Sequence, residues 1–156
     1  MSVSMRTDPS RSAAVESAPA ARPLAGGLLL DGRPLRSPWR LLAAVGAATE
    51  AVAHIPVIEE HLSEAPYIGV GFVLLAVAGI LLTFLLVSAD TAGVWAATAL
   101  VAALALAGYI VSRTVGLPQI GDDVGNWTEP LGLVALSGEG IMLLSAALHL
   151  FTRRRR

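Results

Sequence analysis

Apolar residues gather in four stretches that follow a mostly polar N-terminal segment. The stretches cover about residues 39–57, 67–88, 92–113 and 131–151. Each is close to the roughly 20 residues that an α-helix needs to cross the hydrocarbon core of a bilayer. The pattern therefore predicts an all-α fold, a four-helix transmembrane bundle that occupies residues 38–152.

Polar residues dominate both ends of the chain. Residues 1–37 are rich in Ser, Ala, Pro and Arg, and their one apolar patch, at 28–30, is too short for the core of a signal peptide. A segment with so little apolar surface cannot offset the entropy lost on ordering its backbone. We therefore expect a disordered arm over residues 1–37 and a short basic tail over residues 153–156.

The composition narrows the class of protein. Only 15% of the residues are charged, against about 25% in soluble domains, so lipid is the expected solvent. Cysteine is absent, which excludes disulfides, thiolate metal sites and iron–sulfur clusters. All 11 basic residues are arginine, and this composition favours a GC-rich bacterium and hence a bacterial inner membrane. No nucleotide-binding loop or nucleophile motif is present, so we expect neither enzyme activity nor nucleic-acid binding.

The distribution of arginine predicts the orientation in the cell membrane. Arginine stands at positions 6, 11, 22, 33, 36 and 40 and at the last four positions of the chain. The segments 57–66 and 114–130 contain no basic residue and six acidic ones. Because basic residues favour the cytoplasmic side, we expect both termini in the cytoplasm and both acidic segments outside, which requires an even number of crossings.

Small residues predict which helix faces meet, because helices in lipid pack closely only where side chains are short. The predicted contact positions are Ala43, Gly46, Ala47, Glu50 and His54 in the first helix, Gly69, Ala76, Gly79 and Thr83 in the second, Ala99, Ala103 and Ala107 in the third, and Gly132, Ala135, Glu139 and Ala146 in the fourth. The ionisable residues on these faces are therefore expected to point into the bundle, where a membrane tolerates them.

Glu50 and Glu139 are the most informative of these residues. Each lies about nine residues from the outer end of its helix, so a rise of 1.5 Å per residue places both roughly 13 Å deep. Two neighbouring carboxylates at one depth cannot both stay ionised in a low dielectric without a partner. A proton or cation shared between them would be such a partner. His54 follows Glu50 by one helical turn on the same face.

A second group of polar and aromatic residues is expected at the outer surface. Pro56 lacks an amide hydrogen, so the first helix is expected to kink or end there and to bring His61 over the mouth of the bundle. The residues expected to line this outward pocket, beside the buried ones, are Glu60, His61, Tyr67, Tyr109, Arg113, Trp127 and Glu129. Two further residues, Trp95 and His149, are expected at the membrane interface.

These residues support two hypotheses. In the first, the pocket binds a cation or relays protons, with Glu50, His54, His61 and Glu139 as ligands; histidine with carboxylate suits Cu or Zn. In the second, Arg113 pairs with Glu139 or Glu129, and Glu50 and His54 form only interhelical hydrogen bonds. The protein would then be an accessory or scaffold subunit, packed against another membrane protein or a second copy of itself.

Three segments, His54–His61 with Ala65–Gly69, Gly108–Pro118 and Trp127–Gly132, resemble a group of uncharacterised four-pass membrane proteins of actinobacterial type. The resemblance covers roughly residues 40–150. It implies the four-pass topology and no particular activity.

Overall fold

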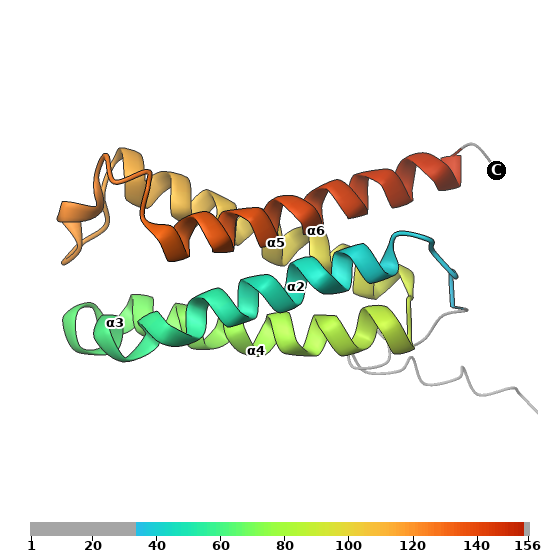
Figure 1. Ribbon diagram of the computed structural model, residues 1–156, viewed down its shortest axis with the longest axis horizontal. Helices are drawn as coiled ribbons and strands as arrows, with labels where there is room; N and C mark the ends of the chain where they lie inside the picture. Colours follow the sequence, from blue (N-terminus) through green and yellow to red (C-terminus); the bar gives the residue numbers. More distant parts are fainter. Residues whose placement is uncertain (1–33, 155–156) are drawn as a thin grey trace, which may run out of the picture.

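The computed structural model describes residues 34–154, and its four long helices lie side by side (Figure 1). These helices are α2 (Arg40–His54), α4 (Pro66–Ser88), α5 (Ala92–Thr114) and α6 (Pro130–Arg154). The 3₁₀ turn η2 (Ile55–Val57) and the helix α3 (Ile58–Glu64) continue α2, and the 3₁₀ turn η3 (Gly121–Asp123) lies between α5 and α6. The all-α four-helix fold is thus confirmed, while the predicted disorder of the arm falls mainly on residues 1–33, outside the described range.

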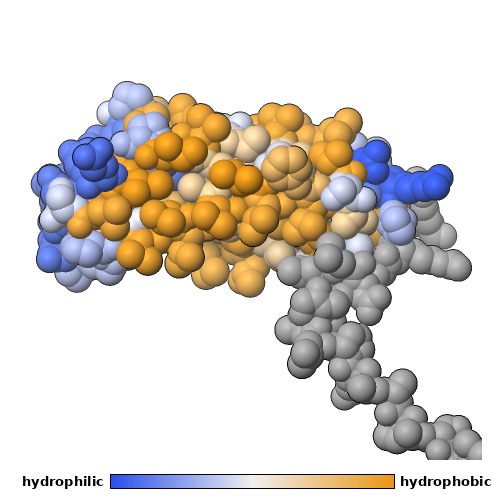
Figure 2. All heavy atoms as spheres, turned by 90° about the horizontal axis from the view of Figure 1, so that it is seen from below, coloured by the Kyte–Doolittle hydropathy of each residue, from blue (hydrophilic) through white to orange (hydrophobic). Residues whose placement is uncertain are grey.

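The surface of the bundle is that of a multi-pass membrane protein. Four helical spans are long and apolar enough to cross a membrane, with α2, η2 and α3 together forming the first. Figure 2 shows apolar side chains around the middle of the bundle and hydrophilic ones at its two ends. We call the end with α3 and residues 115–129 the loop end, and the end with residues 34–39 and 89–91 and the C-terminus of α6 the terminal end.

Helix α2 is the central element of the bundle. It packs most extensively against α6 and α4, while α5 contacts α6 and, less extensively, α4. The helices therefore form a ring in the order α2, α4, α5, α6. Pro56 stands in the 3₁₀ turn that ends α2, which agrees with the expected interruption of the first helix at this residue.

Glycines allow α2 to approach its two neighbours closely. A Cβ atom on Gly138 of α6 would lie 2.8 Å from the carbonyl oxygen of Gly46 and 2.8 Å from the backbone nitrogen of Glu50. A Cβ atom on Gly79 of α4 would lie 2.7 Å from the carbonyl oxygen of Ala47. Side chains at Gly138 and Gly79 would therefore hold the backbones apart, as expected for packing in lipid.

The face of α5 that packs into the bundle differs from the predicted one. Ala103 and Ala107 are exposed and Ala99 is only partly buried, whereas Thr98 and Ala102 are fully buried. The predicted stripe was wrong because α5 is rich in alanine on several faces, so small size alone does not select one. The hydroxyl of Thr98 donates a hydrogen bond to the carbonyl of Val94, and this bond lowers the free-energy cost of burying the hydroxyl.

A buried polar network closes the terminal end. The carboxylate of Asp90 accepts hydrogen bonds from the amide of Ser37 and from the indole nitrogen of Trp95, both at 2.7 Å. His149 hydrogen-bonds the hydroxyl of Ser37 at 2.9 Å and stacks on Trp95 with 4.3 Å between ring centroids. Residues 34–37 are thus held in place, and the amide of Leu35 donates to the carbonyl of Asp90.

This network corrects the expectation that Trp95 and His149 lie at the membrane interface. Both are buried, with 4% of each residue exposed. Each finds a polar partner inside the protein, so neither needs the headgroup region to satisfy its ring nitrogen.

We expect Gly138→Ala to destabilise the protein by about 1–3 kcal/mol, because the added methyl meets backbone atoms that cannot rotate away. Gly140→Ala is the matched control in the same helix, since nothing lies within 4 Å of a Cβ atom there. Thermal unfolding in detergent micelles measures both. Equal midpoints for the two variants would show that the close crossing does not limit the packing of α2 on α6.

Candidate functional site

A cavity of about 500 Å³ lies inside the loop end of the bundle, where the α3–α4 pair and the α5–α6 pair diverge (Figure 1). Residues from all four long helices and from α3 and η3 line it. Of the residues predicted for the pocket, the cavity is lined by His54, Glu60, His61, Tyr109, Arg113, Glu129 and Glu139. Glu50, Tyr67 and Trp127 do not line it.

Glu139 and Glu50 lie at the closed, deep side of the cavity. Glu139 lines the cavity although only 2% of the residue is exposed, and Glu50 is fully buried. Glu139 follows Gly138, which packs directly on the backbone of Glu50, so the two glutamates lie at one crossing of α2 and α6. Neither oxygen of Glu50 has a hydrogen-bond partner among the described residues, and nor does Oε2 of Glu139.

Two histidines follow one another along the wall above Glu50. Nδ1 of His54 lies 2.8 Å from the carbonyl oxygen of Glu50, and Nδ1 of His61 lies 2.8 Å from that of Val57. A carbonyl only accepts hydrogen bonds, so Nδ1 is the donor in both rings. Nε2 of each neutral ring is therefore left with a free lone pair, which can accept a proton or bind a metal ion.

Phe72 of α4 contacts both histidine rings. Its ring centroid lies 4.9 Å from that of His54 and 4.8 Å from that of His61. The contact holds the two imidazoles against the same wall. Sequence analysis missed Phe72, since one more phenylalanine in an apolar helix gives no signal.

Arg113 is held at the mouth of the cavity by the segment after α5. Its side chain is 7% exposed, pairs with Asp123 and has Glu129 at 3.9 Å. Its guanidinium carbon lies 5.0 Å from the ring centroid of Tyr109, within range of a cation–π contact. Ser112 donates to the second oxygen of Asp123 at 3.0 Å.

The arginine thus has its main partner in Asp123, a residue that sequence analysis treated only as part of an acidic loop. Of the two predicted partners, Glu129 lies at 3.9 Å, whereas Glu139 forms no ion pair with Arg113 among the described residues. Glu129 also has a second role. Its carboxylate accepts from the amides of Leu131 and Gly132 at 3.0 and 2.5 Å, so it caps the first turn of α6. These contacts together neutralise the buried guanidinium and fix the start of α6.

Tyr67 and Trp127, the other two residues predicted at the mouth, do not line the cavity, but both take part in contacts that hold residues 115–129 against the bundle. The hydroxyl of Tyr67 donates to the carbonyl of Pro118 at 2.7 Å, which connects α4 to this segment. The hydroxyl of Tyr109 donates to the carbonyl of Trp127 at 3.3 Å. Ile120 is buried in an apolar cluster with Ala65 and Ile68. The segment is therefore packed against both halves of the bundle.

The interior on the terminal side of Glu50 is mainly apolar, with Thr98 and Ser145 as buried polar residues. Leu82, Leu86, Val94 and Met142 are buried there in one cluster together with several alanines. Close packing of this kind leaves no room for water. The cavity thus reaches Glu139 from the loop end, and the described apolar core lies in the other direction.

The four predicted metal ligands do not form one coordination shell. Among residues 34–154, no group of three or more His, Cys, Asp or Glu side chains is placed to hold a metal ion. Tetrahedral zinc sites use three or four protein ligands. The acidic residues at the deep side of the cavity are Glu50 and Glu139. His54 lies one helical turn from Glu50.

No protein-family model, curated protein sequence or solved structure matches the chain. The sequence resemblance to four-pass membrane proteins thus finds support in the four membrane-spanning helices alone.

Proposed function

We propose that this membrane protein takes up a cation, in the simplest case a proton, from one side of the bilayer and holds it between the carboxyl groups of Glu50 and Glu139. The observation that carries the proposal is that these two glutamates are buried at one helix crossing and that their carboxyl groups largely lack hydrogen-bond donors among the described residues. Burying an unpaired carboxylate inside a membrane costs roughly several kcal/mol. A bound proton or cation lowers this cost for the two glutamates.

The walls of the cavity favour this use. His54, His61 and Glu60 line the way from the mouth to Glu139, and each can accept and release a proton. The guanidinium of Arg113 is neutralised by Asp123 and Glu129, so it does not oppose the passage of a cation. A packed apolar core on the far side favours one-sided uptake over conduction. A Cu or Zn ion is the alternative occupant of this site.

The cavity is proposed to open outside the cell. The terminal end has Arg36, Arg40, Arg153 and Arg154 among its described residues, whereas the loop end has six acidic side chains, between residues 57 and 66 or 114 and 130, and Arg113 as its one described arginine. Basic residues favour the cytoplasm. The proton or cation would then come from the extracytoplasmic side.

We expect the infrared spectrum of the native protein in nanodiscs to contain the carbonyl band of a protonated, buried carboxyl group. Glu50→Gln combined with Glu139→Gln should remove this band, because the amides carry no titratable proton. Glu59→Gln, a change on the exposed surface of α3, should leave it. A native spectrum without the band, together with stoichiometric Zn or Cu that the double variant loses, would replace the proton by a metal ion.

The orientation is testable because the chain has no cysteine of its own. We expect Ser63→Cys, exposed at the loop end, to react with a membrane-impermeant maleimide on intact spheroplasts. Ser88→Cys, exposed at the terminal end, should react only after permeabilisation. The reverse pattern would place the cavity mouth in the cytoplasm.

A second candidate function, as a subunit of a larger membrane assembly, is favoured by the exposed face of α5. Ala103 and Ala107 lie on this face with Ala96, and small residues at such spacing allow close approach of another helix. The partner would be a second copy of the chain or a different membrane protein.

We expect Ala103→Leu combined with Ala107→Leu to weaken such an association about tenfold or more, because two bulky side chains would separate the helices. Ala147→Leu, on the exposed surface of α6, is the size-matched control. The mass of the complex in mild detergent, measured by light scattering, is the readout. A native protein that is monomeric at every concentration would remove this candidate.

A further inference from the structure

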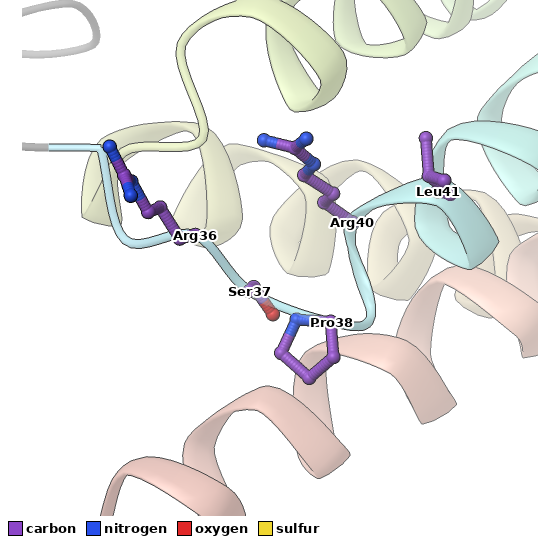
Figure 3. A pocket seen from close by; sticks show the side chains of 5 residues that line it. All are labelled: Arg36, Ser37, Pro38, Arg40 and Leu41. Atoms are coloured by element: carbon purple, nitrogen blue, oxygen red, sulfur yellow. The ribbon is translucent and has the colours of Figure 1, made fainter.

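The terminal end contains a second cavity, of about 440 Å³, at the opposite end of the bundle from the carboxyl pair. It is lined by Arg36, Ser37, Pro38, Arg40 and Leu41, the residues that lead into the first turn of α2 (Figure 3). Figure 3 shows the side chains of Arg36 and Arg40 extending to the same side of this segment. Two guanidinium groups thus border one hollow.

Neither arginine forms an ion pair with an acidic side chain of residues 34–154. Asp90 is the one acidic residue described at this end, and its two oxygens already accept from Ser37 and Trp95. Within residues 34–154, the positive charge of Arg36 and Arg40 is therefore not neutralised by an ion pair.

The backbone that holds these arginines is fixed. Leu35 and Ser37, on either side of Arg36, both donate their amides to Asp90. Arg36 itself has a φ of 49°, a left-handed conformation that few residues other than glycine adopt. The arginines are thus presented by an anchored turn, and little conformational freedom is lost when they bind a ligand.

The start of α2 adds hydrogen-bond donors. No side chain caps this helix. The amide of Arg40 donates to the carbonyl of Ser37 at 3.4 Å, so the amides of Leu41 and Leu42 are the ones left without a partner within the helix. Their partial positive charge favours a phosphate group placed beside them. Arginine suits the same ligand, because its planar guanidinium can donate two parallel hydrogen bonds to phosphate oxygens.

The side chains beyond the cavity indicate which phosphate compound is bound. Leu41, Val45 and Val52 form an exposed apolar stripe along α2, with exposed fractions of 59%, 57% and 65%. The stripe begins at Leu41, which lines the cavity, and continues along α2 toward the middle of the bundle. A soluble anion would gain nothing from it, whereas acyl chains would lie along it.

We propose that Arg36, Arg40 and the N-terminus of α2 form a binding site for the phosphodiester headgroup of an anionic phospholipid, whose acyl chains lie along α2. The site is independent of the carboxyl pair and of the function proposed for it. Because the bound lipid contacts Ser37, it also stabilises the network of Asp90, Trp95 and His149.

The test is a lipid titration of the delipidated full chain, followed by native mass spectrometry. Phosphatidylglycerol should bind, and phosphatidylcholine, which has no net charge, should bind much more weakly. Arg36→Gln combined with Arg40→Gln should lower the affinity for phosphatidylglycerol about 30-fold, as two arginine–phosphate contacts are lost. Arg36→Lys combined with Arg40→Lys should lie between, because charge is kept and the planar fork is lost.

The charge-matched control is Arg153→Gln combined with Arg154→Gln, which removes two exposed arginines at the same end outside the cavity. An equal loss of affinity in the control and in the Arg36–Arg40 variant would mean attraction to the basic surface as a whole and would overturn the site. Displacement of the lipid by millimolar inorganic phosphate would overturn the choice of a lipid. Each variant is first compared with the native protein by thermal unfolding without lipid. Should the double glutamine variant fail to fold, the double lysine variant, which keeps both charges, serves as the test.

Discussion

The close approach of α2 to α6 and α4 is the contact on which the rest of the structure depends. In lipid there is no hydrophobic force to drive two helices together, so dispersion contacts between backbones must do it. Gly138 and Gly79 let these backbones meet with no side chain between them. The same crossing fixes the position of Glu50 against α6 and brings it to Glu139, so the packing contact and the candidate site are one arrangement.

Polar groups occupy the two ends of the bundle in different ways. At the terminal end Asp90, Trp95, Ser37 and His149 satisfy one another, and the hydrogen bonds fasten the chain where it enters α2. At the loop end the charged groups border a cavity, and Arg113 forms ion pairs with Asp123 and Glu129. One end is thus closed by its hydrogen bonds, while the other leaves proton acceptors accessible above a buried carboxyl pair.

Residue patterns predicted much of this arrangement. The small-residue faces predicted that Glu50 and Glu139 point into the bundle, and both are buried. Most residues of the predicted small-residue faces of α2, α4 and α6 are buried, and only Thr83 and Gly132 among them are partly exposed. In each case one face carries both the glycines and the polar residues, so two signals agree.

The same reasoning failed where a helix offers several similar faces or where partners are far apart in sequence. Helix α5 has alanines on several faces. Which of these faces is buried depends on the side that packs against α6. Asp123 and Arg113 are ten positions apart and meet only because residues 115–129 turn back over α5. Ser37 and His149 are 112 positions apart, and no local pattern indicates their contact.

The sequence by itself determined the number of crossing helices, their lengths and the faces on which α2, α4 and α6 carry small and ionisable residues, because helical period and hydropathy are local properties. Only the tertiary structure decided which side chains meet. The Asp90 network, the partner of Arg113 and the cavity above Glu139 arise from the order in which four similar helices pack, and that order depends on contacts between residues distant in the chain.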